Sequence, residues 1–116
     1  MVALWSAIPL AQLHVDPIGL RAHAVIDATG HDAEVVNIVA RKIPKSGVKV
    51  LGEGAMYAHA GEKFTVEKTC EVLPGLFVTG MAVNATFGGP RMGPIFSSML
   101  LSGRKIAELV IRRLEE

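Results

Sequence analysis

The most regular pattern of apolar and polar positions lies toward the end of the chain. Residues 76–78 form an apolar run between a Pro-Gly turn and a glycine, which predicts a short strand buried on both faces. The glycine-rich segment 88–93 follows, and glycines let backbone approach a ligand closely. Apolar residues then recur at helical spacing over 94–114, which predicts a final helix. Its apolar stripe is Ile95, Met99, Gly103, Ile106, Val110 and Leu114.

Pro94 suits the first position of this final helix. The free amides at a helix start favour an anion, and Arg91 adds a planar, permanently charged guanidinium just before it. An ordinary Gly/Pro-rich turn is the alternative interpretation. Gly103 lies in the helix interior, where a glycine costs about 1 kcal/mol. We therefore expect close packing of the backbone against the sheet at Gly103 to offset that cost.

The first part of the chain predicts two strands and a helix. Residues 2–8 carry β-branched and aromatic side chains typical of a strand. Residues 21–29 predict a second strand, which Gly30 stops. The apolar face of this strand is expected to be Ala22, Ala24, Ile26 and Ala28. A helix is predicted over 33–42. Its apolar stripe is Val35, Val36, Ile38 and Val39.

The middle of the chain predicts shorter elements. A connection with proline and glycine leads into a short strand over 48–51, and residues 52–61 are interpreted as a loop over the surface or at an interface. Residues 63–69 alternate apolar and polar side chains, which predicts a strand. That strand is expected to pair with residues 71–73 or with the buried strand at 76–78.

Three residues in this part can bind a ligand or a metal. Thr29 or Asp32 is placed to cap the helix, so His31 is expected at the strand-to-helix junction, where ligands usually bind in α/β sheets. His14 and Asp16 alternate with apolar residues, so both side chains point to the same side if this piece is extended. Solvated or hydrogen-bonded side chains without a ligand are the alternative.

The composition narrows the classes of function. The chain has 116 residues, half of them hydrophobic, which fits one compact domain or a piece of one. Its 12 basic and 11 acidic residues are spread evenly, so no nucleic-acid partner is expected. Cys70 is the only cysteine, which excludes an internal disulfide and favours a reducing cytoplasm. Residues 1–13 lack a basic leader and are too short to span a bilayer, so no membrane insertion is expected.

Two common nucleotide-binding motifs are missing from the sequence. No Gly-x-Gly-x-x-Gly follows a predicted strand, and no phosphate-binding Gly-x-x-x-x-Gly-Lys-Ser/Thr is present. The remaining pattern predicts an α/β chain that forms the C-terminal half of a FAD/NAD(P)-binding, Rossmann-like three-layer fold. Residues 1–116 are then a single partial domain.

Four segments together resemble the thiamine thiazole synthase family. They are LHVDP at 13–17, DATGHDA at 27–33, PGLFVTG at 74–80 and GPRMGP at 89–94. The first two are the specific ones, whereas the last two would fit many FAD- or NAD-binding flavoproteins. The resemblance covers nearly the whole chain and corresponds to the C-terminal half of the family. It implies an enzyme of thiamine biosynthesis that consumes NAD as a substrate and joins its ADP-ribose part to glycine and sulfur, giving an ADP-linked thiazole carboxylate.

The resemblance also implies roles for individual residues. Asp16 and His31 match the iron ligands of the family, and such ligands suit Fe(II) while leaving positions open for substrate. His14 stands where sulfur-sacrificing members carry a donor cysteine, so this chain resembles the members that use free sulfide. Arg91 matches the residue that holds the glycine carboxylate, and Met81 lies where the nucleotide-derived intermediate is contacted, with simple packing as its alternative. The residues expected to contact the cofactor-like molecule are His14, Val15, Asp16, Met81 and Arg91. The catalytic ones are His14 and Arg91.

The N-terminal half of the family has no counterpart in this sequence. The resemblance therefore implies that activity needs an N-terminal partner chain or domain, and it also implies a homo-oligomer. Two other interpretations stay open. One is half of a flavin- or NAD-dependent oxidoreductase, and the other is a non-catalytic remnant that serves oligomerisation.

Overall fold

The computed structural model describes the backbone of residues 2–5 and 18–116, and within these it is a mixed α/β structure. A two-stranded sheet is separate from a three-stranded one. The elements in chain order are β1 (Val2–Trp5), β2 (Ile18–Arg21), β3 (Val25–Asp27), α1 (Glu34–Lys42), the 3-10 helix η2 (Pro44–Ser46), α2 (Ala58–Lys68), β4 (Cys70–Leu73), β5 (Leu76–Val78), α3 (Met81–Phe87) and α4 (Ser97–Glu115). The α/β class predicted from the sequence is confirmed.

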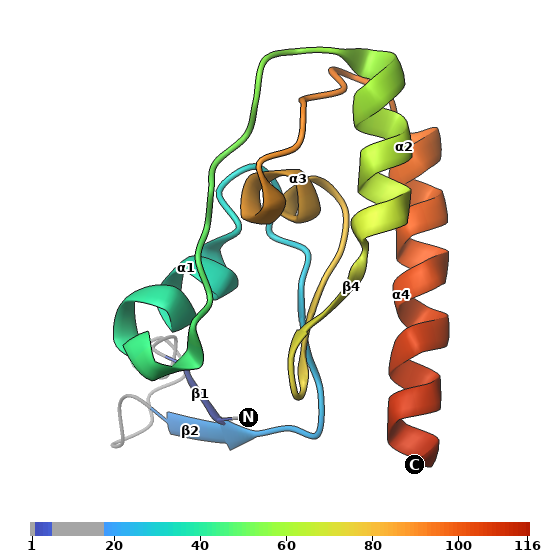
Figure 1. Ribbon diagram of the computed structural model, residues 1–116. Helices are drawn as coiled ribbons and strands as arrows, with labels where there is room; N and C mark the ends of the chain where they lie inside the picture. Colours follow the sequence, from blue (N-terminus) through green and yellow to red (C-terminus); the bar gives the residue numbers. More distant parts are fainter. Residues whose placement is uncertain (1, 6–17) are drawn as a thin grey trace, which may run out of the picture.

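Strand β5 lies at the centre of the three-stranded sheet, whose order is β3-β5-β4. It runs parallel to β3 and antiparallel to β4. Leu76 and Val78 are 0% exposed and pack in one apolar cluster with α1 and α3, while α4 contacts β5 and β4 (Figure 1). The prediction of a strand buried on both faces is confirmed.

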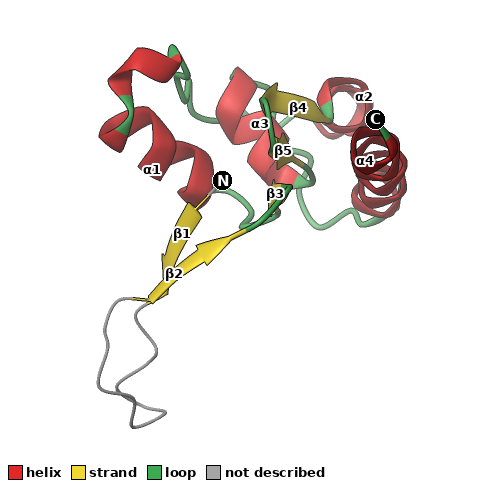
Figure 2. Cartoon of the chain, turned by 90° about the horizontal axis from the view of Figure 1, so that it is seen from below, coloured by secondary structure: helices red, strands yellow, loops and turns green. Residues whose placement is uncertain are grey.

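Strands β1 and β2 form an antiparallel hairpin in which Val2 pairs with Arg21. Figure 2 shows this hairpin projecting from the body of helices around the three-stranded sheet. The predicted first strand is confirmed for residues 2–5, and the remainder of its predicted range lies outside the described residues.

The predicted strand over 21–29 is only partly present. Residues 25–27 form β3, and Ile26, expected on the buried apolar face, is 44% exposed. The buried side is the other one, because Val25 packs against the core and Asp27 is fully buried. Asp27 accepts hydrogen bonds from the backbone N–H of Val36 (2.9 Å), and from the N–H (3.0 Å) and hydroxyl (2.6 Å) of Thr29. The face of β3 that packs on the core therefore carries Val25 and Asp27, and it is not the predicted apolar face.

Helix α1 confirms the helix predicted after His31. Val36 and Val39 of its predicted stripe are buried, whereas Ile38 is exposed. Neither Thr29 nor Asp32 is the N-cap residue, which is Ala33, but the Thr29 hydroxyl oxygen accepts the N–H of Glu34 in the first turn at 2.8 Å.

Residues 63–68 of the predicted strand over 63–69 are helical, because they belong to α2. The buried face of α2 consists of Gly61 and Thr65, with Thr69 directly after its end. These three residues lie one helical turn apart, but they are small or polar. The alternation of apolar and polar residues over 63–69 therefore predicted a strand where the chain forms a helix. Helices α2 and α4 lie side by side in both views, and the Lys105 ammonium of α4 donates to the carbonyls of Val66 and Glu67, at 2.8 Å each (Figures 1 and 2).

The short strand predicted over 48–51 is also absent. Residues 47–57, here called the strap, run without regular secondary structure from η2 to α2. The N–H groups of Leu51 and Gly52 donate to the carbonyls of Thr86 (3.2 Å) and Ala85 (2.8 Å) near the end of α3. The strap is therefore hydrogen-bonded to carbonyl groups at the C-terminal end of a helix and not to a neighbouring strand.

Helix α3 was not predicted, and it occupies the start of the connection after β5. Its residues from Met81 to Thr86 are all buried, so no polar face reveals its period. The final helix starts at Ser97 and not at Pro94, because residues 93–96 form a turn in which the Ile95 N–H donates to the Gly93 carbonyl. Within residues 2–5 and 18–116, no helix is long and apolar enough to cross a membrane.

Replacing Asp27 tests its role as the buried link between β3 and α1. Asp27→Ala should lower the free energy of unfolding by about 2–4 kcal/mol, because it leaves the buried N–H of Val36 and the partly buried N–H of Thr29 without an acceptor. Asp32→Ala, an exposed carboxylate in the same connection, should change it by less than about 0.5 kcal/mol. Urea unfolding followed by circular dichroism measures both, and equal losses would contradict this role.

Candidate functional site

A hollow of about 410 Å³ lies where the chain leaves β3 and β5. We call it the β3–β5 hollow, and its lining is Ala28, Gly30, His31, Thr79, Gly80, Met81, Met99 and Gly103. Parallel strands bring their carboxyl ends to one edge of a sheet, and ligands of open α/β sheets bind at that edge. Two of the predicted site residues, His31 and Met81, therefore meet in one hollow.

A buried polar network supports the floor of this hollow. The Ser102 hydroxyl contacts the hydroxyl of Thr79 at 2.8 Å and accepts the N–H of Gly80 at 3.0 Å, and Thr69 binds the same oxygen. Gly80 has φ 66° and ψ −147°, a conformation that favours glycine. Ser102 thus fixes the turn from which α3 starts.

Gly103 does not pack closely against the sheet, contrary to our expectation. A Cβ built on it would find no atom within 4 Å, apart from those of its own chain neighbours and helix. The space beside it is part of the β3–β5 hollow. The glycine therefore leaves the hollow open at this point of α4.

His31 lies at the junction between β3 and α1, as predicted. Its side chain is 66% exposed, and its Nδ1 atom lies 2.7 Å from Oε1 of Glu53, a side chain that is only 12% exposed. Glu53 is on the strap, 22 residues away along the chain. Sequence reasoning missed it, because no local pattern distinguishes a carboxylate in an irregular segment.

Met81 is the first residue of α3 and is 4% exposed. It packs in the interior and also lines the β3–β5 hollow. Both interpretations of this residue, packing and ligand contact, are compatible with that position.

Arg91 is exposed and does not line the β3–β5 hollow. Its backbone is bound to the strap, since its N–H donates to the Ala55 carbonyl (3.2 Å) and its carbonyl accepts the N–H of Tyr57 (2.9 Å). Asn84 holds the preceding turn, because its amide donates to the Pro90 carbonyl at 2.6 Å and its oxygen accepts from the Thr65 hydroxyl at 2.7 Å. The role of Arg91 in binding a carboxylate stays a prediction.

His14, Val15 and Asp16 lie outside the described residues. Within the part of the chain that the structure describes, no three or more His, Cys, Asp or Glu side chains form a group that could hold a metal. The imidazole of His31 nevertheless fits a metal ligand. Glu53 contacts its Nδ1 atom, and the Nε2 atom takes no part in that contact. Of the two predicted iron ligands, Asp16 and His31, His31 thus has a nitrogen atom that suits a metal.

Cys70 is half-buried at the start of β4. Burial raises the pKa of its thiol, while the ammonium groups of Lys105 and Lys68 act in the opposite direction and Glu71 adds to the rise. A raised pKa leaves less thiolate, which is the reactive form. This environment is that of a structural cysteine rather than a nucleophile.

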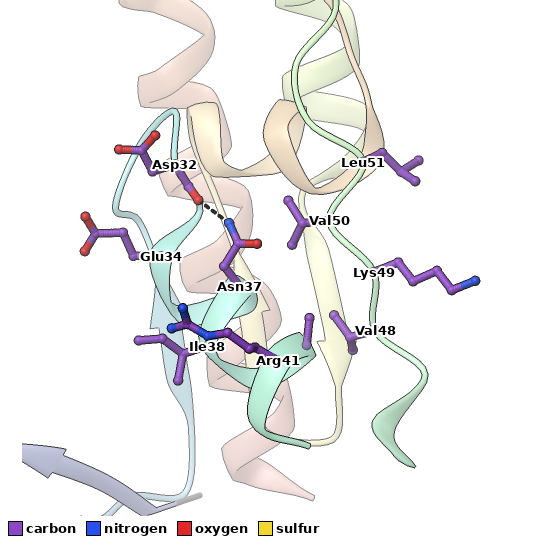
Figure 3. A pocket seen from close by; sticks show the side chains of 10 residues that line it. Asp32, Glu34, Asn37, Ile38, Arg41, Val48, Lys49, Val50 and Leu51 are labelled. Carbon is purple, nitrogen blue, oxygen red and sulfur yellow. Dashed lines mark hydrogen bonds between the residues drawn. The ribbon is translucent and has the colours of Figure 1, made fainter. Parts of the chain in front are cut away.

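A larger hollow of about 870 Å³ lies between α1 and the strap, as Figure 3 shows. Its lining includes acidic Glu34 and basic Arg41 and Lys49, and the Asn37 amide donates to the Asp32 carbonyl at 2.6 Å. It contains neither histidine nor cysteine. The charges of opposite sign along its wall do not indicate a particular ligand.

Comparison with known proteins identifies the family. The model of the Thi4 family matches residues 1–96. The chain belongs to the Thi4 family. The resemblance seen in the sequence motifs is thereby confirmed.

Similar proteins named "Thiamine thiazole synthase" occur in several organisms. The chain is 54% identical to that of Pyrobaculum arsenaticum over 97% of this chain and 43% of the relative. It is 55% identical to that of Desulfosudis oleivorans over 99% of this chain and 46% of the relative. The crystal structure of Thermovibrio ammonificans THI4 superposes with a TM-score of 0.83 at 44% identity, over 99% of this chain and 46% of that one. The chain spans less than half the length of these relatives.

Gly103 offers a test of the open space beside α4. Gly103→Ala should raise the free energy of unfolding by up to about 1 kcal/mol, because alanine favours the helix and meets no neighbour. Gly89→Ala is the matched control and should destabilise the chain, since its Cβ would lie 2.2 Å from Phe64 Cδ1. Thermal and urea unfolding measure both variants, and a destabilised Gly103→Ala would contradict an open hollow.

Proposed function

We propose that this chain is the C-terminal part of a thiamine thiazole synthase and works together with an N-terminal part. The proposed reaction forms an ADP-thiazole carboxylate from NAD, glycine and sulfide, with Fe(II) bound at the site. The observation that carries the proposal is His31 in the β3–β5 hollow of a Thi4 family member. The names of the similar proteins support the same activity.

The described residues suit three tasks in this reaction. His31 offers an imidazole nitrogen as an iron ligand beside the hollow, and the Arg91 guanidinium can hold the glycine carboxylate with two parallel hydrogen bonds. Gly80 and Gly103 leave room for the nucleotide-derived part, and Met81 gives an apolar contact. The turn at Gly80 is held by Ser102, so this wall is fixed before a ligand arrives.

The residues proposed beyond the described part complete the site. Asp16 is the second iron ligand, and His14 occupies the position of the sulfur donor, which makes free sulfide the sulfur source. Val15 contacts the nucleotide-derived part beside them. When bound, Fe(II) would supply open coordination positions that hold substrate atoms together without a change of redox state.

The proposed N-terminal part has an open sheet edge on which to assemble. Strand β3 pairs with β5 on one side, and among the described strands none lies on its other side. Val25 and Asp27 direct their backbone groups to the β5 side, since the Val25 N–H donates to Gly75 and the Asp27 carbonyl accepts from Thr79. Ile26, which is 44% exposed, therefore directs its backbone groups to the open edge. An unpaired edge with an exposed apolar side chain favours association with another chain or domain.

The activity is tested by supplying the missing part. The chain is combined anaerobically with the part of the Pyrobaculum arsenaticum relative that it does not match, together with NAD, glycine, sulfide and Fe(II). Mass spectrometry should detect an ADP-thiazole, and omission of sulfide should abolish it. The complete relative is the positive control. If the control yields product and the combination, shown to associate, yields none, the proposal fails.

The iron ligands are tested in the same assembled protein. Asp16→Ala and His31→Ala should each abolish stoichiometric Fe(II) binding, because a site with two protein ligands cannot lose either one. His14→Ala should retain most of the binding, since His14 is not a proposed ligand. Anaerobic titration measures all three, and equal iron affinity in the three variants would refute the metal assignment.

A further inference from the structure

Glu53 and His31 differ in how firmly their surroundings hold them. The Glu53 side chain is 12% exposed, whereas the His31 side chain is 66% exposed, and their atoms Oε1 and Nδ1 lie 2.7 Å apart. The embedded carboxylate is thus the fixed partner of this contact. The projecting imidazole is the partner that needs to be oriented.

The backbone around Glu53 is bound on both sides. Before it, the Gly52 N–H donates to the Ala85 carbonyl at 2.8 Å, and after it the Gly54 N–H donates to the Gly89 carbonyl at 2.8 Å. Gly52 has φ 82°, a left-handed conformation that favours glycine and turns the strap at this point. Glu53 therefore lies between two residues whose backbone N–H groups are both hydrogen-bonded.

We propose that Glu53 is a positioning residue that holds the His31 ring with a proton on Nδ1 and leaves Nε2 as the ligand atom. The inference rests on the proposed function, in which His31 binds Fe(II). An ionised carboxylate has no proton to donate, so Nδ1 must be the donor in a 2.7 Å contact. A neutral imidazole with its proton on Nδ1 carries its lone pair on Nε2. Carboxylates hold ligating histidines in this way in many metal sites.

The strap that carries Glu53 also carries the backbone partners of Arg91. Two residues after Glu53, the Ala55 carbonyl accepts the Arg91 N–H, and the Tyr57 N–H donates to the Arg91 carbonyl. One irregular segment thus orients the proposed iron ligand and the proposed glycine-binding residue. Glu53 is where that segment contacts His31, which lines the β3–β5 hollow.

A surface ion pair without a positioning role is the alternative. Such pairs contribute about 0–1 kcal/mol to stability, so a stability measurement cannot distinguish the two. The position of the imidazole proton can distinguish them. An ion pair requires only opposite charge, whereas a positioning residue requires an acceptor atom at Nδ1.

The first experiment determines the tautomer of His31 by nitrogen-15 NMR of the labelled chain, at a pH where its ring is neutral. The parent should carry the proton on Nδ1. Glu53→Gln keeps an acceptor oxygen without the charge and should preserve this tautomer, whereas Glu53→Ala should shift the population toward the proton on Nε2. Glu34→Gln, which removes a carboxylate three residues from His31, is the matched control and should leave it unchanged.

The second experiment measures anaerobic Fe(II) affinity in the assembled protein. Glu53→Ala should weaken binding about 10–100-fold, as the loss of such partners typically does, and Glu53→Gln should recover most of the loss. If Glu53→Ala keeps both the tautomer and the affinity of the parent while His31→Ala loses iron, the inference about Glu53 is wrong and the proposed function stands. If His31→Ala binds iron as the parent does, the iron assignment falls and the inference falls with it.

Discussion

The structure around the candidate site depends on one buried carboxylate. Asp27 ends β3, and it accepts hydrogen bonds from Thr29 and from the N–H of Val36 in the first turn of α1. Burial of a carboxylate is costly unless hydrogen bonds compensate it, so the strand end and the helix start are held in one arrangement. Between them the chain passes through Ala33, whose left-handed φ of 42° is rare for a residue other than glycine. His31 is presented by this connection, and Asp27 is therefore what fixes its place.

Other parts of the site follow the same rule, in which a small buried polar side chain fixes an irregular segment. Ser102 binds Thr79 and the Gly80 N–H at one end of α3, and Asn84 binds the Pro90 carbonyl at the other. Loops lack internal hydrogen-bond ladders, so their backbone groups need such partners when they are buried. The candidate site consists mostly of connections, and buried side chains hold three of them, whereas backbone hydrogen bonds hold the strap.

The sequence predicted the elements in which apolar residues face the core. This held for β5 and for most of α1, and the His31 junction followed from the order of β3 and α1. It held less well for α4, where only Ile106 of the predicted stripe is buried and the other buried residues are Ser98 and Ser102. It failed for α2, whose buried face is Gly61 and Thr65, and for α3, which is buried all round and has no polar side to reveal a period. The buried face of β3 was reversed because Asp27 is a buried polar residue. In each failure, packing or a hydrogen bond outweighed hydropathy.

Glu53 could not be predicted from sequence for a related reason. Its contact with His31 spans 22 residues, and its position depends on the strap binding the carbonyls at the end of α3 and the turn before Arg91. These bonds have a consequence for the proposed site. Because the Arg91 backbone and Glu53 share the strap, a ligand that displaces the segment around Arg91 must strain the bonds that hold Glu53, and through Glu53 the ring of His31. The groups proposed to bind glycine and iron are thus parts of one hydrogen-bonded unit, although they lie on segments far apart in the chain.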